Sequence, residues 1–209
     1  QVRFVLAPLL NALQICQTVR ASATVIWGTL SAATVLPLVI SKCAFDPTWI
    51  AVDGSLSIPN TQIEISANSD TLCNSGWTDG FDFLEDATGN CEAGDVLILP
   101  GGTTLAAGAE GILPQCRPII QALYNNGQTF TVPIVRSRTP PGSSSTYTVD
   151  GFASFKLCGY ALGGGYIENT CSTICTGLPS QHRICGTFAS LPLNSGELGN
   201  SGDYGTRVI

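Results

Sequence analysis

The sequence predicts a mainly β domain, sandwich-like and antiparallel, with one or two short helices and with disulfide bonds as staples. Three observations predict this class. The 209 residues include 23 glycines and 12 prolines, which interrupt nearly every segment and disfavour long helices. Between them lie runs rich in Val, Ile, Thr and aromatic residues, as in strands. Nine cysteines are spread along the chain. We expect a single domain over residues 1–209.

The expected strands cover residues 18–27, 62–66, 96–99, 129–136, 147–157 and 206–209. Within the fifth strand, Gly151 follows an alternating pattern and indicates a bulge or a close approach of another backbone. The Pro- and Ser-rich stretch 139–145 reads as the turn of a hairpin. One helix is expected over 118–127, with Pro118 in its first turn and Gly127 at its end, and a second before Leu13. The longest breaks are 70–94, 138–145 and 163–179.

Charged residues make up only 11% of the chain, against about 25% in typical globular proteins. The net charge is −6, and the nine basic residues are scattered, so no basic stripe is available to neutralise phosphates. The composition therefore argues against nucleic acid and anionic membrane surfaces as partners. A surface made soluble by neutral polar groups is typical of extracellular proteins.

The cysteines indicate an oxidising compartment. The disulfide candidates are Cys43, Cys73, Cys91, Cys116, Cys158, Cys171, Cys175 and Cys185. We expect Cys91 to pair with Cys116, and Cys185 to pair with either Cys171 or Cys175. Because nine is odd, one thiol stays without an intrachain partner, and we assign this to Cys16.

Residues 163–185 are read as a cysteine-rich loop insertion. The alternative for this segment is a zinc site that includes His182. Structural zinc sites usually combine two tight cysteine doublets, and this segment has one loose doublet, so disulfides are favoured.

An acidic stretch between residues 70 and 95 holds seven of the fifteen acidic residues. Its candidate calcium ligands are Asp79, Asp82, Glu85 and Asp86, because oxygen-rich loops bind this ion. The spacing does not match an EF-hand, and a solvated acidic loop is the preferred reading. No other cofactor is expected.

Catalytic signals are few. His182 is the only histidine, and no Gly-x-Ser-x-Gly sequence accompanies it. The glycine runs at 101–102 and 163–165 lack the following Lys-Ser/Thr and helix that a phosphate loop requires. We therefore expect a protein that is not an enzyme.

Several short motifs follow one another along the chain. They are RASATVIWG at 20–28, LPLVISKCAF at 36–45, GFDFLE at 80–85 with GNC at 89–91, GD at 94–95, LPQC at 113–116, TVPIV at 131–135, YTVDGFASFKLCGY at 147–160, CGTF at 185–188 and GTRVI at 205–209. In this order they resemble the C-terminal, extracytoplasmic region of TadE/TadG-like proteins of tight-adherence (Flp) pilus systems. The chain departs from that pattern in Cys16, Cys158 and Cys175, and in lacking the family's N-terminal membrane helix, as a fragment would.

The resemblance implies a non-catalytic structural or assembly component of a bacterial surface filament. Its location would be extracellular or in the cell envelope, with a membrane tether only through a segment upstream. Its partners would be other pilus or envelope proteins, or further copies in a filament. The alternative is a secreted adhesin or binding module for a glycan or a protein, and the third reading is a secreted hydrolase. A filament subunit should cover apolar surface with its neighbours, whereas an adhesin should expose a cleft.

Overall fold

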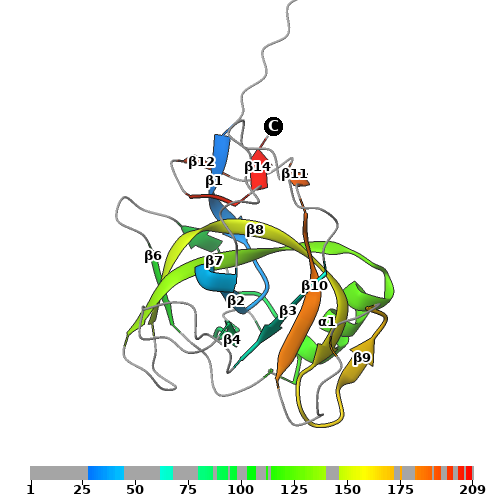
Figure 1. The fold of residues 1–209 in the computed structure, drawn as a ribbon. Coiled ribbons are helices and arrows are strands. Elements are labelled where there is room, and N and C mark those ends of the chain that lie inside the picture. The colour runs from blue at the N-terminus through cyan, green and yellow to red at the C-terminus, as the bar shows by residue number, and fades with distance from the viewer. Residues whose placement is uncertain are drawn as a thin grey trace, which may run out of the picture.

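The computed structural model of the chain describes residues 28–44, 62–67, 80–86, 89–93, 95–97, 103–106, 112, 114–139, 146–171, 175, 182–189, 191–193, 197–199, 202–204 and 206–208. The expected strand at 18–27, the helix before Leu13, and the residues Cys16, Cys73 and Asp79 lie outside these ranges. The described part is mainly β, with one α-helix (Figure 1). The predicted fold class is therefore confirmed.

A nine-stranded sheet forms the body of the protein. Its main path runs in the order β3 (Ile63–Ser66), β10 (Arg183–Ala189), β8 (Thr146–Ala161), β7 (Thr129–Thr139), β2 (Leu38–Ser41) and β4 (Phe81–Phe83). Three short strands also pair with β8: β6 (Thr103–Ala106), β9 (Ile167–Asn169) and β13 (Gly202–Tyr204). The 16-residue β8 is thus the strand around which the sheet is built.

A smaller, five-stranded sheet lies at one end of this body, at the top of Figure 1. It contains β1 (Gly28–Thr34), β5 (Asp95–Leu97), β11 (Leu191–Leu193), β12 (Glu197–Gly199) and β14 (Thr206–Val208). Both sheets are mixed, because β2–β7, β13–β8 and β11–β14 pair in parallel. The expectation of purely antiparallel sheets is wrong at these three pairs. The chain between β2 and β7 is long enough for the crossover that a parallel pair requires.

The long β7–β8 pair is a hairpin around the predicted turn at 139–145. Its register shifts on both sides of Val135, where Ile134 faces Gly151 and Val135 faces Val149. Asp150 is therefore an extra residue on β8, which confirms the bulge predicted near Gly151. The second shift makes Arg136 an extra residue on β7, and its NH1 lies 3.5 Å from the Asp150 carboxylate.

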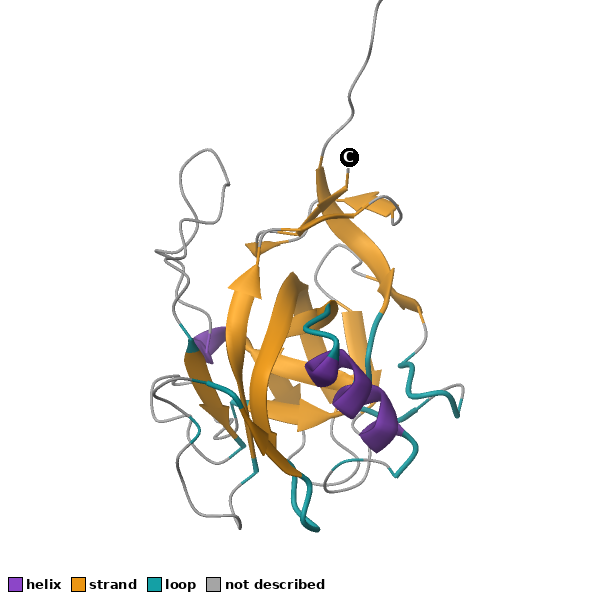
Figure 2. Cartoon of the chain, turned by 90° about the vertical axis from the view of Figure 1, so that its right-hand side faces the viewer, coloured by secondary structure: helices purple, strands orange, loops and turns teal. Residues whose placement is uncertain are grey.

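Helix α1 (Cys116–Asn125) confirms the predicted helix and begins two residues earlier than expected. Pro118 is tolerated in its first turn because the N–H groups there have no partner within the helix. At the other end the Asn126 N–H bonds the Ala122 carbonyl, and Gly127 has a φ of 58° that favours glycine. The helix packs against the side of the large sheet (Figure 2), where Cys116 and Ile120 are buried.

The core lies between α1 and the large sheet. Aromatic rings from three strands meet there, and the Phe155 ring lies 5.1 Å from that of Phe188 and 6.1 Å from that of Phe130. Among the described residues, those with no exposed surface include Val39, Ile40, Val132, Ile134, Val149, Ala153 and Phe155. No helix in the described part of the chain has the length and apolar composition needed to cross a membrane.

Two segments expected as breaks or loops contain regular structure. The stretch 70–94 includes β4, and the segment 163–185, expected as a loop insertion, includes β9 and the first residues of β10. The strand β2 was not expected. The strands β2 and β4 have four and three residues and are stabilised by pairing with each other across about 40 residues of chain, which no local pattern reveals.

Candidate functional site

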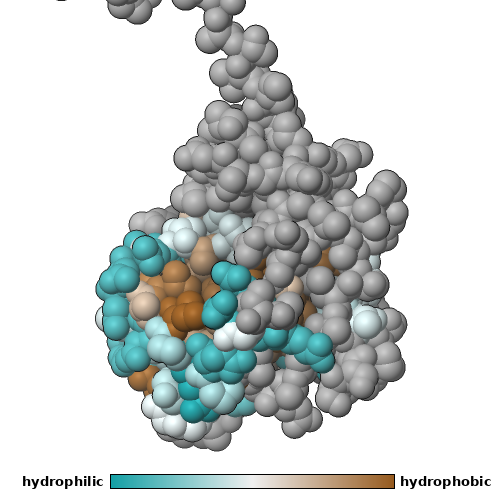
Figure 3. Space-filling model, turned by 180° about the vertical axis from the view of Figure 1, so that it is seen from behind, coloured by the Kyte–Doolittle hydropathy of each residue, from teal (hydrophilic) through white to brown (hydrophobic). Residues whose placement is uncertain are grey.

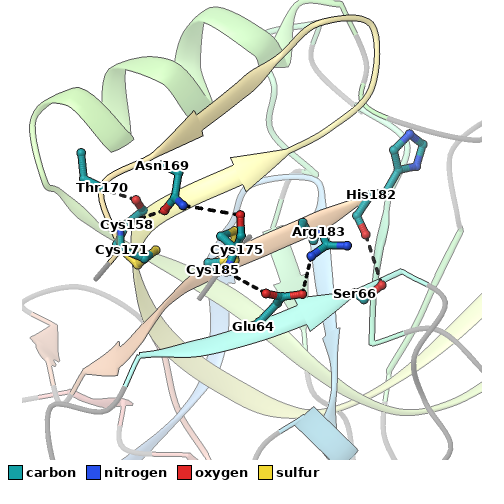
Figure 4. The surroundings of a disulfide bond; sticks show 10 residues. All are labelled: Glu64, Ser66, Cys158, Asn169, Thr170, Cys171, Cys175, His182, Arg183 and Cys185. Carbon is teal, nitrogen blue, oxygen red and sulfur yellow. Dashed lines mark hydrogen bonds and ion pairs between the residues drawn. A yellow bond between two sulfur atoms is a disulfide. The ribbon is translucent and has the colours of Figure 1, made fainter. Parts of the chain in front are cut away.

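Two disulfides lie side by side at one end of the large sheet, Cys158–Cys171 and Cys175–Cys185 (Figure 4). We call these two bonds the paired cystines. Cys158 lies on β8 and Cys185 on β10, while their partners come from the segment that follows β9. The paired cystines therefore fasten this segment to two neighbouring strands.

Hydrogen bonds fix the fastened segment further. The N–H and hydroxyl of Thr170 both donate to the Cys158 carbonyl, at 2.8 and 3.0 Å. Asn169 accepts from the Cys171 N–H at 2.9 Å and donates to the Cys175 carbonyl at 3.4 Å. Each half-cystine is thus tied to the sheet by its main chain as well as by its sulfur.

Glu64 on β3 joins a third strand to the paired cystines (Figure 4). One carboxylate oxygen accepts from the Cys175 N–H at 2.7 Å, and the other accepts from Arg183 NH1 at 2.7 Å. The Arg183 side chain is 6% exposed, so a carboxylate beside it compensates a guanidinium that has lost most of its hydration.

Glu64, Cys175 and Cys185 also form the one group in the described part of the chain whose ligand atoms lie close enough together to hold a metal ion. The two sulfurs are bonded to each other in a disulfide, and metals bind thiolates. The structure therefore confirms disulfides here, and of the two partners proposed for Cys185 it selects Cys175.

The predicted Cys91–Cys116 disulfide is confirmed, and it ties the start of α1 to the loop before β5. Asp86 shapes this loop. Its two carboxylate oxygens accept from the N–H groups of Gly89, Cys91 and Glu92 and from the Gln115 amide, at 2.8–3.1 Å. These bonds hold Cys91 at a φ of 62°, an uncommon conformation for a residue with a side chain.

The other calcium candidates lie apart from Asp86. Asp82 accepts a hydrogen bond from the Tyr147 hydroxyl and lies 3.6 Å from Arg138 NH1, while Glu85 is exposed. Asp82, Glu85 and Asp86 do not form a metal-binding group within the described residues. Asp79 lies outside those residues, so the four-residue calcium site stays a prediction.

His182 contributes its main chain to the fold. Its carbonyl accepts from the Ala67 N–H at 3.0 Å and from the Ser66 hydroxyl at 3.5 Å. The imidazole lies against Gly163, where a β-carbon would be 2.8 Å from Nε2. Ser66 therefore donates to the main-chain carbonyl of His182 and not to its imidazole ring, which a catalytic serine would use as its base.

An open polar groove of about 780 Å³ adjoins the paired cystines. Its polar lining consists of Gln62, Asn125, Asn126, Lys156, Glu168 and Thr170, and Tyr124 and Leu157 add apolar surface. Tyr124 packs edge-on against Tyr160, with ring centres 5.5 Å apart. Burial, and then the negative charge of Glu168, raise the pKa of the Tyr160 hydroxyl above its usual value.

A second, apolar groove of about 250 Å³ lies beside the Cys91–Cys116 disulfide. Its lining includes Leu36, Ile119, Leu123 and Phe130, all of them only partly buried. On the rear face of the protein, hydrophobic residues gather in one area framed by hydrophilic ones (Figure 3). Because α1 lines both grooves, with Ile119 and Leu123 in one and Tyr124 and Asn125 in the other, this helix separates two surfaces of different chemistry.

Sequence reasoning missed the Cys158–Cys171 pair and both grooves. Cysteine spacing does not determine connectivity, and a pairing signal appears only after β8 and β9 are recognised as neighbours. Cys43 is a further confirmed half-cystine. Comparison with protein-family models, with curated proteins and with solved structures found no match to this chain.

Proposed function

We propose that this chain is a non-catalytic structural or assembly component of a bacterial surface filament system of the TadE/TadG-like kind. In this proposal the domain lies outside the cytoplasm and contacts other filament or envelope proteins. The ordered motif series is the sequence argument for it. The structural observation that supports it best is the set of disulfides that fastens α1 to the loop before β5 and the segment after β9 to the large sheet.

The three disulfides whose two cysteines both lie in the described part of the chain close loops of 25, 13 and 10 residues. Under tension, a cross-linked loop cannot be extended. At about 3.4 Å for each residue, these loops withhold roughly 160 Å of chain from stretching. Covalent staples of this kind suit a protein that carries load or persists outside the cell, and disulfides are stable in oxidising compartments.

The apolar groove supplies a contact surface for such an assembly. Leu36, Ile119, Leu123 and Phe130 leave part of their apolar surface in water, and covering it with a neighbouring subunit is favourable by about 25 cal/mol for each Å². We assign the groove to a neighbouring subunit of the same filament.

Chromosomal replacement in the source bacterium tests this function. Leu123→Asp places a charge in the apolar groove, whereas Gln121→Asp places the same charge on an exposed position of the same helix. We expect deletion of the gene and Leu123→Asp to lower the number of surface filaments in negative-stain electron micrographs. Gln121→Asp should leave it unchanged, with equal amounts of protein in both variants.

Thiol alkylation before and after reduction reports the compartment, because cysteines of a cytoplasmic protein are kept reduced. Reduced cysteines in cells, or normal filaments after deletion, would contradict the proposal.

A further inference from the structure

The polar groove offers hydrogen-bonding groups of both kinds from three separate elements. Asn125 and Asn126 lie at the end of α1, Lys156 on β8 and Glu168 on β9. Within the described part of the chain, these four side chains have no hydrogen-bond partner. Amides donate and accept, a carboxylate accepts and an ammonium donates, so the groove can satisfy ligand groups of either character.

The charges of the groove nearly cancel. It contains one cation, Lys156, and one anion, Glu168. The Lys156 side chain also crosses Gly127, where a β-carbon would lie 3.6 Å from Nζ. This places the ammonium at the C-terminal end of α1, where the helix dipole carries partial negative charge. The groove therefore attracts neither polyanions nor polycations.

The groove also has apolar surface at one side. Tyr124 and Leu157 both line it, and the Tyr124 ring is held by its edge-on contact with Tyr160. An aromatic ring with neighbouring amides and a carboxylate matches a ligand that has an apolar C–H face and a rim of hydroxyl groups.

The walls of the groove are rigid before any ligand binds. Cys158 lines it and is bonded to Cys171, and Thr170 is tied to the Cys158 carbonyl by two hydrogen bonds. At the end of α1, the Gly127 and Gln128 N–H groups bond carbonyls of the helix. A preformed site loses little entropy when it binds, which raises affinity.

We propose that the polar groove binds a neutral oligosaccharide. Each sugar hydroxyl donates and accepts hydrogen bonds, as the lining requires, and a pyranose ring has an apolar face for Tyr124. The volume of about 780 Å³ lies within the range of small-ligand sites and admits a few sugar units. A peptide would gain its affinity from apolar anchors in pockets, and only Tyr124 and Leu157 supply large apolar side chains here. The proposal goes beyond the structural role and does not depend on it, because a filament component can also bind glycan.

Isothermal titration calorimetry with the purified, oxidised chain tests this binding. The neutral probes are maltohexaose, cellohexaose, chitohexaose and mannohexaose, each at up to about 10 mM to reach weak affinities. A heparin hexasaccharide is the anionic probe, and an eight-residue Val/Thr peptide is the peptide probe. The groove variants are Asn126→Ala and Glu168→Gln. The matched control is Gln121→Ala, which removes an amide from an exposed position of the same helix outside the groove.

We expect at least one neutral hexasaccharide to bind, and each groove variant to weaken it about tenfold, as the loss of one or two hydrogen bonds does. Gln121→Ala should bind like the unaltered chain. The proposal is overturned if no neutral probe binds, if only heparin or the peptide binds, or if the groove variants bind as tightly as the control. Urea unfolding of all three variants, with unchanged midpoints, ensures that a lost affinity reports the groove and not the fold.

Discussion

Removing the Cys91–Cys116 disulfide is the most quantitative test of how this chain is held together. The bond closes 25 residues, for which loop-closure entropy gives about 3.5 kcal/mol of stabilisation at 25 °C. The same calculation gives about 2.7 kcal/mol for Cys175–Cys185, which closes 10 residues. The double variant Cys91→Ala, Cys116→Ala should therefore lose more stability than the double variant Cys175→Ala, Cys185→Ala.

Core packing should widen the difference in stability loss between the two double variants. Cys91 and Cys116 are each 1% exposed, so both alanines leave unfilled space next to Ile112 and Ile120. In the second pair only Cys185 is fully buried, and Cys175 is partly exposed. The first double variant should therefore lose at least about 3.5 kcal/mol, and the gap between the variants should exceed the entropic difference of about 0.8 kcal/mol.

Urea unfolding followed by far-ultraviolet circular dichroism measures both losses, and equal m-values would show that the same surface is exposed in each case. A loss below about 1 kcal/mol for the first variant would refute the loop-closure reasoning. So would a larger loss for the second variant, because its loop is shorter and less of its sulfur is buried.

Three further outcomes follow from single contacts. Gly186→Ala would place a β-carbon 2.1 Å from the Lys156 carbonyl oxygen, so we expect a loss above about 3 kcal/mol or no folded protein, judged by circular dichroism and urea midpoint. Glu64→Gln keeps the shape but removes the charge facing Arg183, and should lower the unfolding free energy by about 1–3 kcal/mol in the same assay. Burial raises the pKa of Tyr160, so the folded state binds this proton more tightly and its stability contribution, full below about pH 10, is lost as pH rises through the raised value. Tyr160→Phe should flatten the fall of the urea midpoint above pH 10, and an unchanged pH profile would contradict this.

Short sequence patterns correctly predicted the parts of the fold in which a residue restricts its own backbone or has one characteristic chemistry. The strand expected at 147–157 lies within β8, and Gly151 marks the bulge at Asp150. Pro118 and Gly127 bracket α1 because one suits a first helical turn and the other a left-handed end. The Cys91–Cys116 pair was also predicted. In each case the residues themselves restrict the backbone or the chemistry.

Other parts of the fold depend on partners far away in the chain. The strand β2 pairs with β4 and β7, and β10 pairs with β3 and β8. The four residues of β2 are too few to show a clear alternating pattern. Asp86 was predicted as a calcium ligand because the sequence shows only its negative charge. In the structure its carboxylate accepts hydrogen bonds from N–H groups of the following loop, and these come together only when the loop folds. The grooves escaped prediction for the same reason, since their lining comes from several elements.

The paired cystines connect the two proposed roles of this protein. Cys158 is at once half of a disulfide and part of the wall of the polar groove. Reduction of Cys158–Cys171 would leave Thr170 and Glu168 held to β8 by hydrogen bonds alone. A bond that limits extension of the chain therefore also fixes the geometry of the groove. Conditions that reduce it should weaken sugar binding before the large sheet unfolds, because α1 and the β7–β8 hairpin do not depend on that bond.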